Sequence, residues 1–146
     1  MSVNVIKEIK SLNTCLVRHL FANKNVIQGK RPKPLQVEII DYLSKNQDKI
    51  IYQRDLEENL QISKAAISEV LISMEKNGFI EKINDEDDGR KKRVILTQDT
   101  IKMHNKVIKE LRKLNNNLLD GISEEDLNIF IKVINKLKEN MKKEGI

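Results

Sequence analysis

The chain has 146 residues, 39% of them hydrophobic and 34% charged, with only two prolines and five glycines. This length fits one ordinary domain, the scarcity of helix breakers favours a mainly α fold, and a net charge of +5 favours an anionic partner. A single cysteine excludes an internal disulfide and paired-cysteine zinc ligands. The lack of a long apolar run or a secretory signal predicts a cytosolic protein without membrane spans.

The first predicted element is an amphipathic helix over residues 3–25, because apolar residues recur there at spacings of three or four. The recurring residues are Ile6, Ile9, Leu12, Leu16 and Leu20. Residues 28–34, QGKRPKP, contain a glycine and both prolines, which predicts a loop. A second helix is expected over residues 35–45.

The next segment predicts a short strand at residues 50–51 and a short helix at 53–59, QRDLEEN, with Leu56 on its buried face. Ser63 is suited to cap a further helix that extends to Asn77, and Gly78 is suited to end it. The inner stripe of this helix consists of Ala66, Ile67, Val70, Leu71 and Met74. Residues 79–84 and 93–97 are β-prone and flank a polar turn with a glycine, which predicts a hairpin.

The C-terminal part predicts two more helices. A long helix carries Met103, Val107, Leu111, Leu114 and Leu118. Asp120 and Gly121 end it, and Ser123 is suited to cap the last helix. In that helix an apolar seam repeats at alternating spacings of three and four, at Leu127, Phe130, Ile134, Leu137 and Met141. Such a seam implies a partner helix, either in a second copy of the chain or in the chain's own core.

The order of elements between residues 53 and 97 is short helix, tight turn, helix, glycine and hairpin, which is that of a winged helix-turn-helix. Its second helix must be held by an apolar stripe and offer small or polar N-terminal residues to the major groove of DNA. The residues on that outer face are Ser63, Lys64, Ala65, Ser68 and Glu69. The segment is therefore predicted to read DNA.

These residues resemble those of the MarR-type (multiple antibiotic resistance) regulators. The match lies in DLEENLQISKAAISEVLISMEKNGFIEKI (55–83) and in DGRKKRVILT (88–97), where Asp88 and Arg90 precede Leu96 and Thr97. The resemblance covers nearly the whole chain. It implies a mainly α fold, a winged helix-turn-helix with N- and C-terminal dimerisation helices, within one domain over residues 1–146. Residues 35–97 would be the DNA-binding part, here named the reading head, and residues 1–30 and 98–146 the dimerisation part.

The resemblance also assigns roles to individual residues. The segment facing the major groove would comprise Ser63, Lys64, Ala65, Ala66, Ser68 and Glu69. Arg90 would enter the minor groove with Asp88 holding it, and Lys91, Lys92 and Arg93 would follow the phosphates. The dimer interface would comprise Ile6, Ile9, Leu127, Phe130, Ile134, Leu137 and Met141. Two positions depart from the family pattern: Ala66, where threonine or serine is common, and Glu69, where a basic residue is common.

Glu69 has two interpretations, since it either accepts a hydrogen bond from cytosine or points to solvent or to a lysine. Cys15 is either a redox-sensing thiol assisted by His19 one turn on, or a small buried hydrophobe. Cys15, His19 and His104 could form a metal site, but a solvated or hydrogen-bonded histidine is the commoner arrangement. No nucleophile motif or phosphate loop is present, so an enzyme is not expected.

The sequence thus predicts a cytoplasmic, homodimeric regulator that binds double-stranded DNA at a pseudo-palindromic operator, and the resemblance implies that it is a repressor. No cofactor is expected, and the resemblance implies a small aromatic or amphipathic effector. Two alternatives remain open. One is a regulator that senses redox state through Cys15. The other is a helical dimer that acts on a protein partner, supported by Glu69 and by the acidic run DEDD at residues 85–88.

Overall fold

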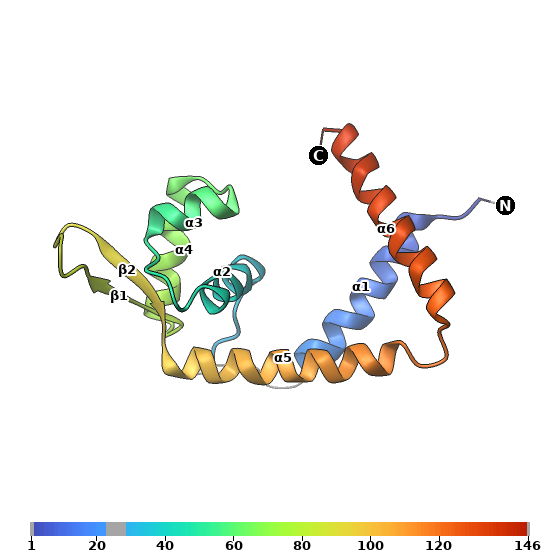
Figure 1. The fold of residues 1–146 in the computed structure, drawn as a ribbon, viewed down its shortest axis with the longest axis horizontal. Coiled ribbons are helices and arrows are strands. Elements are labelled where there is room, and N and C mark those ends of the chain that lie inside the picture. The colour runs from blue at the N-terminus through green and yellow to red at the C-terminus, as the bar shows by residue number, and fades with distance from the viewer. Residues whose placement is uncertain (1, 23–28, 146) are drawn as a thin grey trace. The chain divides into compact units, whose positions relative to one another are not determined.

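A computed structural model describes residues 2–22 and 29–145 of the chain. Its contacts form two compact units, Met1–Glu110 and Leu111–Ile146. The first contains α1 (Val5–Ala22), α2 (Pro34–Lys45), α3 (Gln53–Leu60), α4 (Lys64–Lys76), β1 (Ile80–Asn84), β2 (Lys92–Leu96) and the start of α5 (Gln98–Leu118). The second contains the end of α5 and α6 (Glu124–Lys143). In the first unit, α2, α3, α4 and the hairpin lie together on one side of the start of α5 (Figure 1).

Local sequence signals set most of the element ends. Ser63 caps α4, since its Oγ accepts a hydrogen bond from the Ala66 N–H at 3.2 Å, and Ser123 caps α6 in the same way. Gly78 follows α4 with a φ of 78°, the left-handed conformation that glycine adopts without strain. These three predictions are confirmed.

Two predicted boundaries differ from the structure. The predicted loop at 28–34 is too long by one residue, because Pro34 is the first residue of α2, a position that suits its fixed φ and missing N–H. Gln28 lies outside the described residues. The predicted helix over 3–25 begins at Val5 and is described to Ala22, and its residues 23–25 lie outside the described residues.

The reading head encloses the main apolar core. The inner stripe of α4 is confirmed, since Ile67, Leu71 and Met74 are fully buried and Ala66 and Val70 are half-buried. The other core residues come from α2, α3, the hairpin and the segments beside them, and they are Ile39, Ile40, Leu43, Ile51, Leu56, Phe79, Ile80, Val94 and Leu96. The core therefore holds α4 on one side and leaves its opposite side outward.

The wing is an antiparallel hairpin in which β1 pairs with β2 from Ile80–Leu96 to Asn84–Lys92. The strand predicted at residues 50–51 is wrong. The chain enters α3 at Gln53, so only a single bridge between Tyr52 and Arg93 and a hydrogen bond from the Val94 N–H to the Ile51 carbonyl join this segment to β2. The start of α3 is nonetheless tied directly to the wing.

No helix among residues 2–22 and 29–145 is long and apolar enough to cross a membrane.

Candidate nucleic-acid interface

The first two turns of α4 present the residues predicted to face the major groove. Ser63, Lys64, Ala65 and Glu69 are exposed, and Ala66 and Ser68 are half-buried at the edge of the core-facing stripe. The Glu69 carboxylate has no ion pair or hydrogen bond with any described residue. This face is therefore small, polar and open, which is what entry into a major groove requires.

The wing turn, residues 85–91, is closed by its own backbone. The Asp85 N–H donates to the Lys91 carbonyl at 2.9 Å, and the Lys91 N–H donates to the Asp88 carbonyl at 3.0 Å. The Asp88 side chain accepts a hydrogen bond from the backbone N–H of Arg90 at 3.0 Å. Asp88 thus shapes the turn that carries Arg90.

The guanidinium of Arg90 is not held by Asp88 in this structure, in contrast to the expectation. It is exposed and has no partner within the described part of the chain. A cation on an exposed turn is free to approach a narrow minor groove, where the electrostatic potential is most negative.

Tyr52, Asp85 and Arg93 form a polar cluster at the base of the wing that the sequence did not predict. The Tyr52 hydroxyl donates a hydrogen bond to the buried carboxylate of Asp85. The Arg93 guanidinium lies 3.9 Å from the same carboxylate. The hydrogen bond from Tyr52 lowers the pKa of Asp85 and raises the pKa of Tyr52, because it stabilises the ionised carboxylate and the neutral phenol. Asp85 is therefore an internal anchor and not part of a solvated acidic face.

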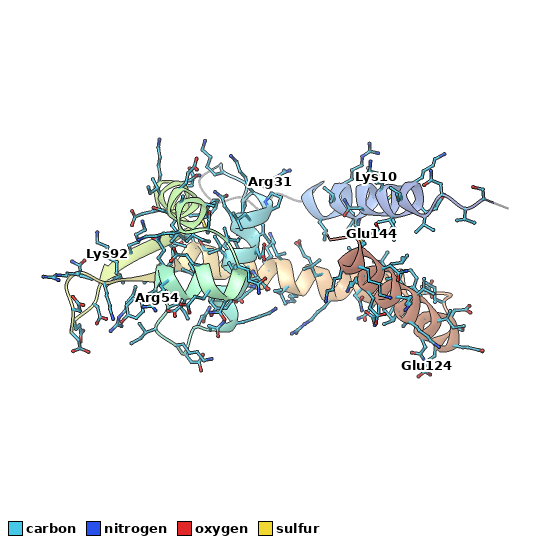
Figure 2. All side chains as sticks on the ribbon, turned by 90° about the horizontal axis from the view of Figure 1, so that it is seen from above. Lys10, Arg31, Arg54, Lys92, Glu124 and Glu144 are labelled. Atoms are coloured by element: carbon cyan, nitrogen blue, oxygen red, sulfur yellow. The ribbon has the colours of Figure 1, made fainter. Side chains whose placement is uncertain are left out.

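An open groove of about 580 Å³ separates α3 from the wing. Figure 2 labels Arg54 of α3 and Lys92 of β2, which both line it. The cations of the lining are Arg54, Lys82, Arg90, Lys91 and Lys92, and its carboxylates are Asp55 and Glu58. The Glu58 carboxylate pairs with Arg54 at 3.2 Å, and the Asp55 carboxylate accepts from the Tyr52 N–H at 2.8 Å. The groove therefore carries an excess of positive charge.

Two of these cations, Arg54 and Lys82, were missed by the sequence analysis. In the sequence, Arg54 has the i, i+4 spacing of a surface ion pair with Glu58. Lys82 has the position of an outward-facing residue of a strand. The helix-turn-helix order was the signal that could have indicated these two cations. The first turn of α3 comes immediately after Tyr52, the residue that bridges to the hairpin, so this turn lies beside the wing.

Cys15, His19 and His104 are not gathered into a site. Cys15 and His19 are exposed on α1, whereas the His104 side chain is only 12% exposed and its Nε2 lies 4.0 Å from Asp41 Oδ1. Within the described ranges, no three histidine, cysteine, aspartate or glutamate residues lie close enough to hold a metal ion. The interpretation of Cys15 as a buried hydrophobe is wrong for the single chain, because its side chain is exposed.

The residues predicted to form the dimer interface leave apolar surface open. Ile6 and Ile9 on α1 are 70% and 52% exposed, and Phe130 and Met141 on α6 are 50% and 55% exposed. The other three interface residues, Leu127, Ile134 and Leu137, are half-buried. Apolar stripes of this length on two helices favour a further apolar partner.

Comparisons with known proteins match both parts of the chain. The model of the MarR family matches residues 32–91. The heme sensor protein PefR from Streptococcus agalactiae, solved in complex with heme, is 30% identical with a TM-score of 0.73, over 96% of this chain and 95% of that one. The transcription regulator MarR from Oenococcus oeni is 25% identical with a TM-score of 0.57, over 92% of this chain and 96% of that one.

A third solved structure shows the fold alone. MepR, a transcription regulator of the Staphylococcus aureus multidrug efflux pump MepA, is 18% identical with a TM-score of 0.68, over 97% of this chain and 99% of that one. None of the curated proteins matches the chain significantly. The similarities confirm the predicted mainly α, winged helix-turn-helix fold.

Proposed function

Because the chain belongs to the MarR family of transcription regulators, we propose that it represses transcription by binding a pseudo-palindromic operator as a homodimer. The family consists of DNA-binding regulators and not of enzymes. The observation that carries the proposal is the pairing of an open, polar α4 face with a wing whose Arg90 is exposed and unpaired within the described chain.

In this proposal, the two elements have different tasks. The first turns of α4 enter the major groove, where Lys64 and Ser68 contact base edges and set sequence preference. Arg90 enters the minor groove, where its charge supplies affinity and a preference for groove width. In a dimer, each copy places α4 in a major groove and Arg90 in a minor groove.

The groove between α3 and the wing extends the proposed surface. Arg54, Lys82, Lys91 and Lys92 line its two sides, and a sugar–phosphate strand crossing from the major to the minor groove is the polyanion that such a lining suits. These cations contribute affinity and register but no base preference. The exposed Arg54–Glu58 pair adds little stability to the fold, so the guanidinium is available to a phosphate.

The dimer is proposed to form through residues 1–30 and 98–146, with the reading head at residues 35–97. The apolar stripes of α1 and α6 support this division, because a second copy would cover the exposed parts of Ile6, Ile9, Phe130 and Met141. One domain over residues 1–146 then contains both functions.

A small aromatic or amphipathic molecule is proposed to release the operator. PefR is a heme sensor, and heme belongs to this chemical class. Two cavities among the described residues lack histidine, cysteine and methionine in their lining, and Tyr52 in the first is their one side chain of a type that ligates heme iron. A titration with hemin and with iron-free porphyrin, read as operator release, separates iron ligation from binding of a flat amphipathic ring.

The protein-partner alternative loses part of its support, because Asp85 is buried and bonded within the chain. The deciding experiment is selection of bound sequences from a random duplex pool by the full chain. We expect two inverted half-sites whose centres lie about one helical turn, ~10 base pairs, apart. A folded dimer that enriches no sequence and binds no duplex at low salt would favour the protein partner.

A further inference from the structure

Tyr52 is the residue that precedes α3, and it is fixed to that helix by its backbone. Its N–H donates to the Asp55 carboxylate at 2.8 Å, and its carbonyl accepts from the Asp55 N–H at 3.0 Å. Asp55 lies in the first turn of α3, which packs on α4 through the buried Leu56 and Ile67. Tyr52 is thus part of the framework that holds α4.

The same residue touches both ends of the wing turn. Its hydroxyl donates to the carboxylate of Asp85, where the turn begins. Its ring lies 5.5 Å from the Nζ of Lys91, where the turn ends, within the range of a cation–π contact. Its backbone also forms the bridge to Arg93 on β2. Two side-chain contacts and one backbone bridge therefore tie the wing to the start of α3.

We propose that Tyr52 is the positioning residue of the wing, which fixes the direction of Arg90 relative to α4 through its contacts with Asp85 and Lys91. Ile80, Val94 and Leu96 hold the base of the hairpin in the core of the head, but the turn at residues 85–91 lies beyond these residues. A two-stranded ribbon is only marginally stable in water on its own, so the turn needs an anchor of its own to keep one orientation. A hydrogen bond to a buried carboxylate is stronger than one between neutral groups. The proposal rests on the proposed function, because the direction of Arg90 matters only where the wing meets DNA.

The test compares Tyr52→Phe with Tyr42→Phe. Tyr52→Phe removes the hydroxyl and keeps the ring over Lys91. Tyr42 is the other tyrosine of the chain, is half-buried on α2, and its hydroxyl has no partner among residues that the structure describes, so its change is a matched control. In the free protein we expect faster amide hydrogen exchange over residues 86–91 in Tyr52→Phe and no change in Tyr42→Phe.

On a selected operator, we expect Tyr52→Phe to weaken binding roughly three- to tenfold, the scale of one lost hydrogen bond. A double-mutant cycle with Arg90→Ala reports positioning directly. If Tyr52 aims the wing, Arg90→Ala costs less affinity in the Tyr52→Phe background than in the original chain. Tyr42→Phe is expected to leave both the affinity and the cost of Arg90→Ala unchanged.

Two results would overturn the proposal. The first is unchanged exchange over residues 86–91 in Tyr52→Phe; if binding is weaker all the same, the Tyr52 hydroxyl contacts DNA itself. The second is a lower melting temperature with the full cost of Arg90→Ala retained, which is the behaviour of a merely stabilising residue. Failure of the original chain to bind any duplex would refute the proposed function, and the exchange measurement would still decide whether Tyr52 anchors the wing.

Discussion

The reading head and the helices α1 and α6 differ in how far they bury their apolar residues. Leu56, Ile67 and Phe79 in the head are fully buried, whereas Ile6 on α1 and Phe130 on α6 remain 70% and 50% exposed. The head obtains its stability from its own core. The two helices carry equally regular apolar stripes, but every residue of these stripes is exposed or only half-buried in the chain. The difference indicates that the apolar packing of the head is complete within one chain, whereas the stripes of α1 and α6 favour a further apolar partner.

The largest expected effect comes from removing α6. Deleting residues 123–146 should abolish dimerisation, because the apolar seam of α6 is lost with the helix. Operator binding should weaken by about 10²- to 10⁴-fold, since each head would then bind its half-site alone. Sedimentation and operator titration measure the two effects. A truncated chain that stays dimeric and protects the same operator would show that α6 is not needed for the dimer.

A point substitution in the apolar seam tests the same interface more mildly, because it keeps α6 intact. Phe130→Glu places a charge on the exposed seam, and Asn128→Glu places the same charge on an exposed position outside it. We expect Phe130→Glu alone to raise the dimer dissociation constant, because a carboxylate at an apolar interface must be desolvated without a partner. Equal behaviour of the two variants would show that the seam is not the interface.

The next effect concerns the core of the head. Leu71→Ala should lower the free energy of unfolding by about 2–5 kcal/mol, because a fully buried leucine is replaced and a cavity remains. Ile72, its neighbour on α4, is 59% exposed, so Ile72→Ala should change it by no more than about 0.5 kcal/mol. Urea unfolding measures both. Similar values for the two variants would contradict the assignment of the inner stripe.

The wing provides a smaller and more specific effect. Arg90→Ala should weaken binding to most sequences and lower the slope of log affinity against log salt by about one, as expected for one charge that displaces a counterion. Lys10→Ala removes an exposed cation from α1, outside the proposed DNA surface, and is the control for net charge. Unchanged affinity and salt slope in a folded Arg90→Ala protein would refute the wing contact.

Substitutions on α4 should differ from Arg90→Ala in kind. Lys64→Ala or Ser68→Ala is expected to change which bases are preferred within each half-site, because major-groove contacts carry base choice. Repeating the sequence selection with each variant measures this. A uniform loss of affinity with an unchanged consensus would instead place these residues on the phosphates.

The features that the sequence predicted well are those set by nearby residues. Ser63 bonds to a backbone N–H three residues on, and Gly78 supplies a left-handed conformation at a single position. The contact between Tyr52 and Asp85 joins residues 33 positions apart. Asp85 lies in an acidic run that has the composition of a solvated loop, and it is buried only in the folded head, where Tyr52 contacts its carboxylate. The groove cation Arg54 was missed for the same reason, because the groove that it lines also lies between segments that are far apart in the sequence.

The apolar stripes of α1 and α6 were predicted by their periodicity, but periodicity does not identify the partner helix. A stripe facing its own core and a stripe facing a second copy have the same spacing of apolar residues. The structure of one chain adds the exposure of Ile6 and Phe130. This is why the dimer stays a prediction that truncation and sedimentation must test.

The smallest expected effect is that of Cys15→Ser. Cys15 is exposed, which a sensing thiol requires, but a reactive thiolate also needs a stabilising cation or hydrogen bond. Arg18 and His19 lie one turn further along α1, and neither makes a contact with the thiol in the described part of the chain. We therefore expect the original chain and Cys15→Ser to bind the operator equally, before and after peroxide.

Paired operator titrations of the two proteins in peroxide measure this. Loss of binding in the original chain alone, reversed by a thiol reductant, would contradict the expectation and establish Cys15 as a sensor. Loss in both proteins would have another cause, because peroxide also converts methionine to its polar sulfoxide. Met141, half-exposed on the proposed interface, is the residue whose oxidation would weaken the dimer. Cys15→Ser thus separates a redox switch on α1 from oxidative damage on α6.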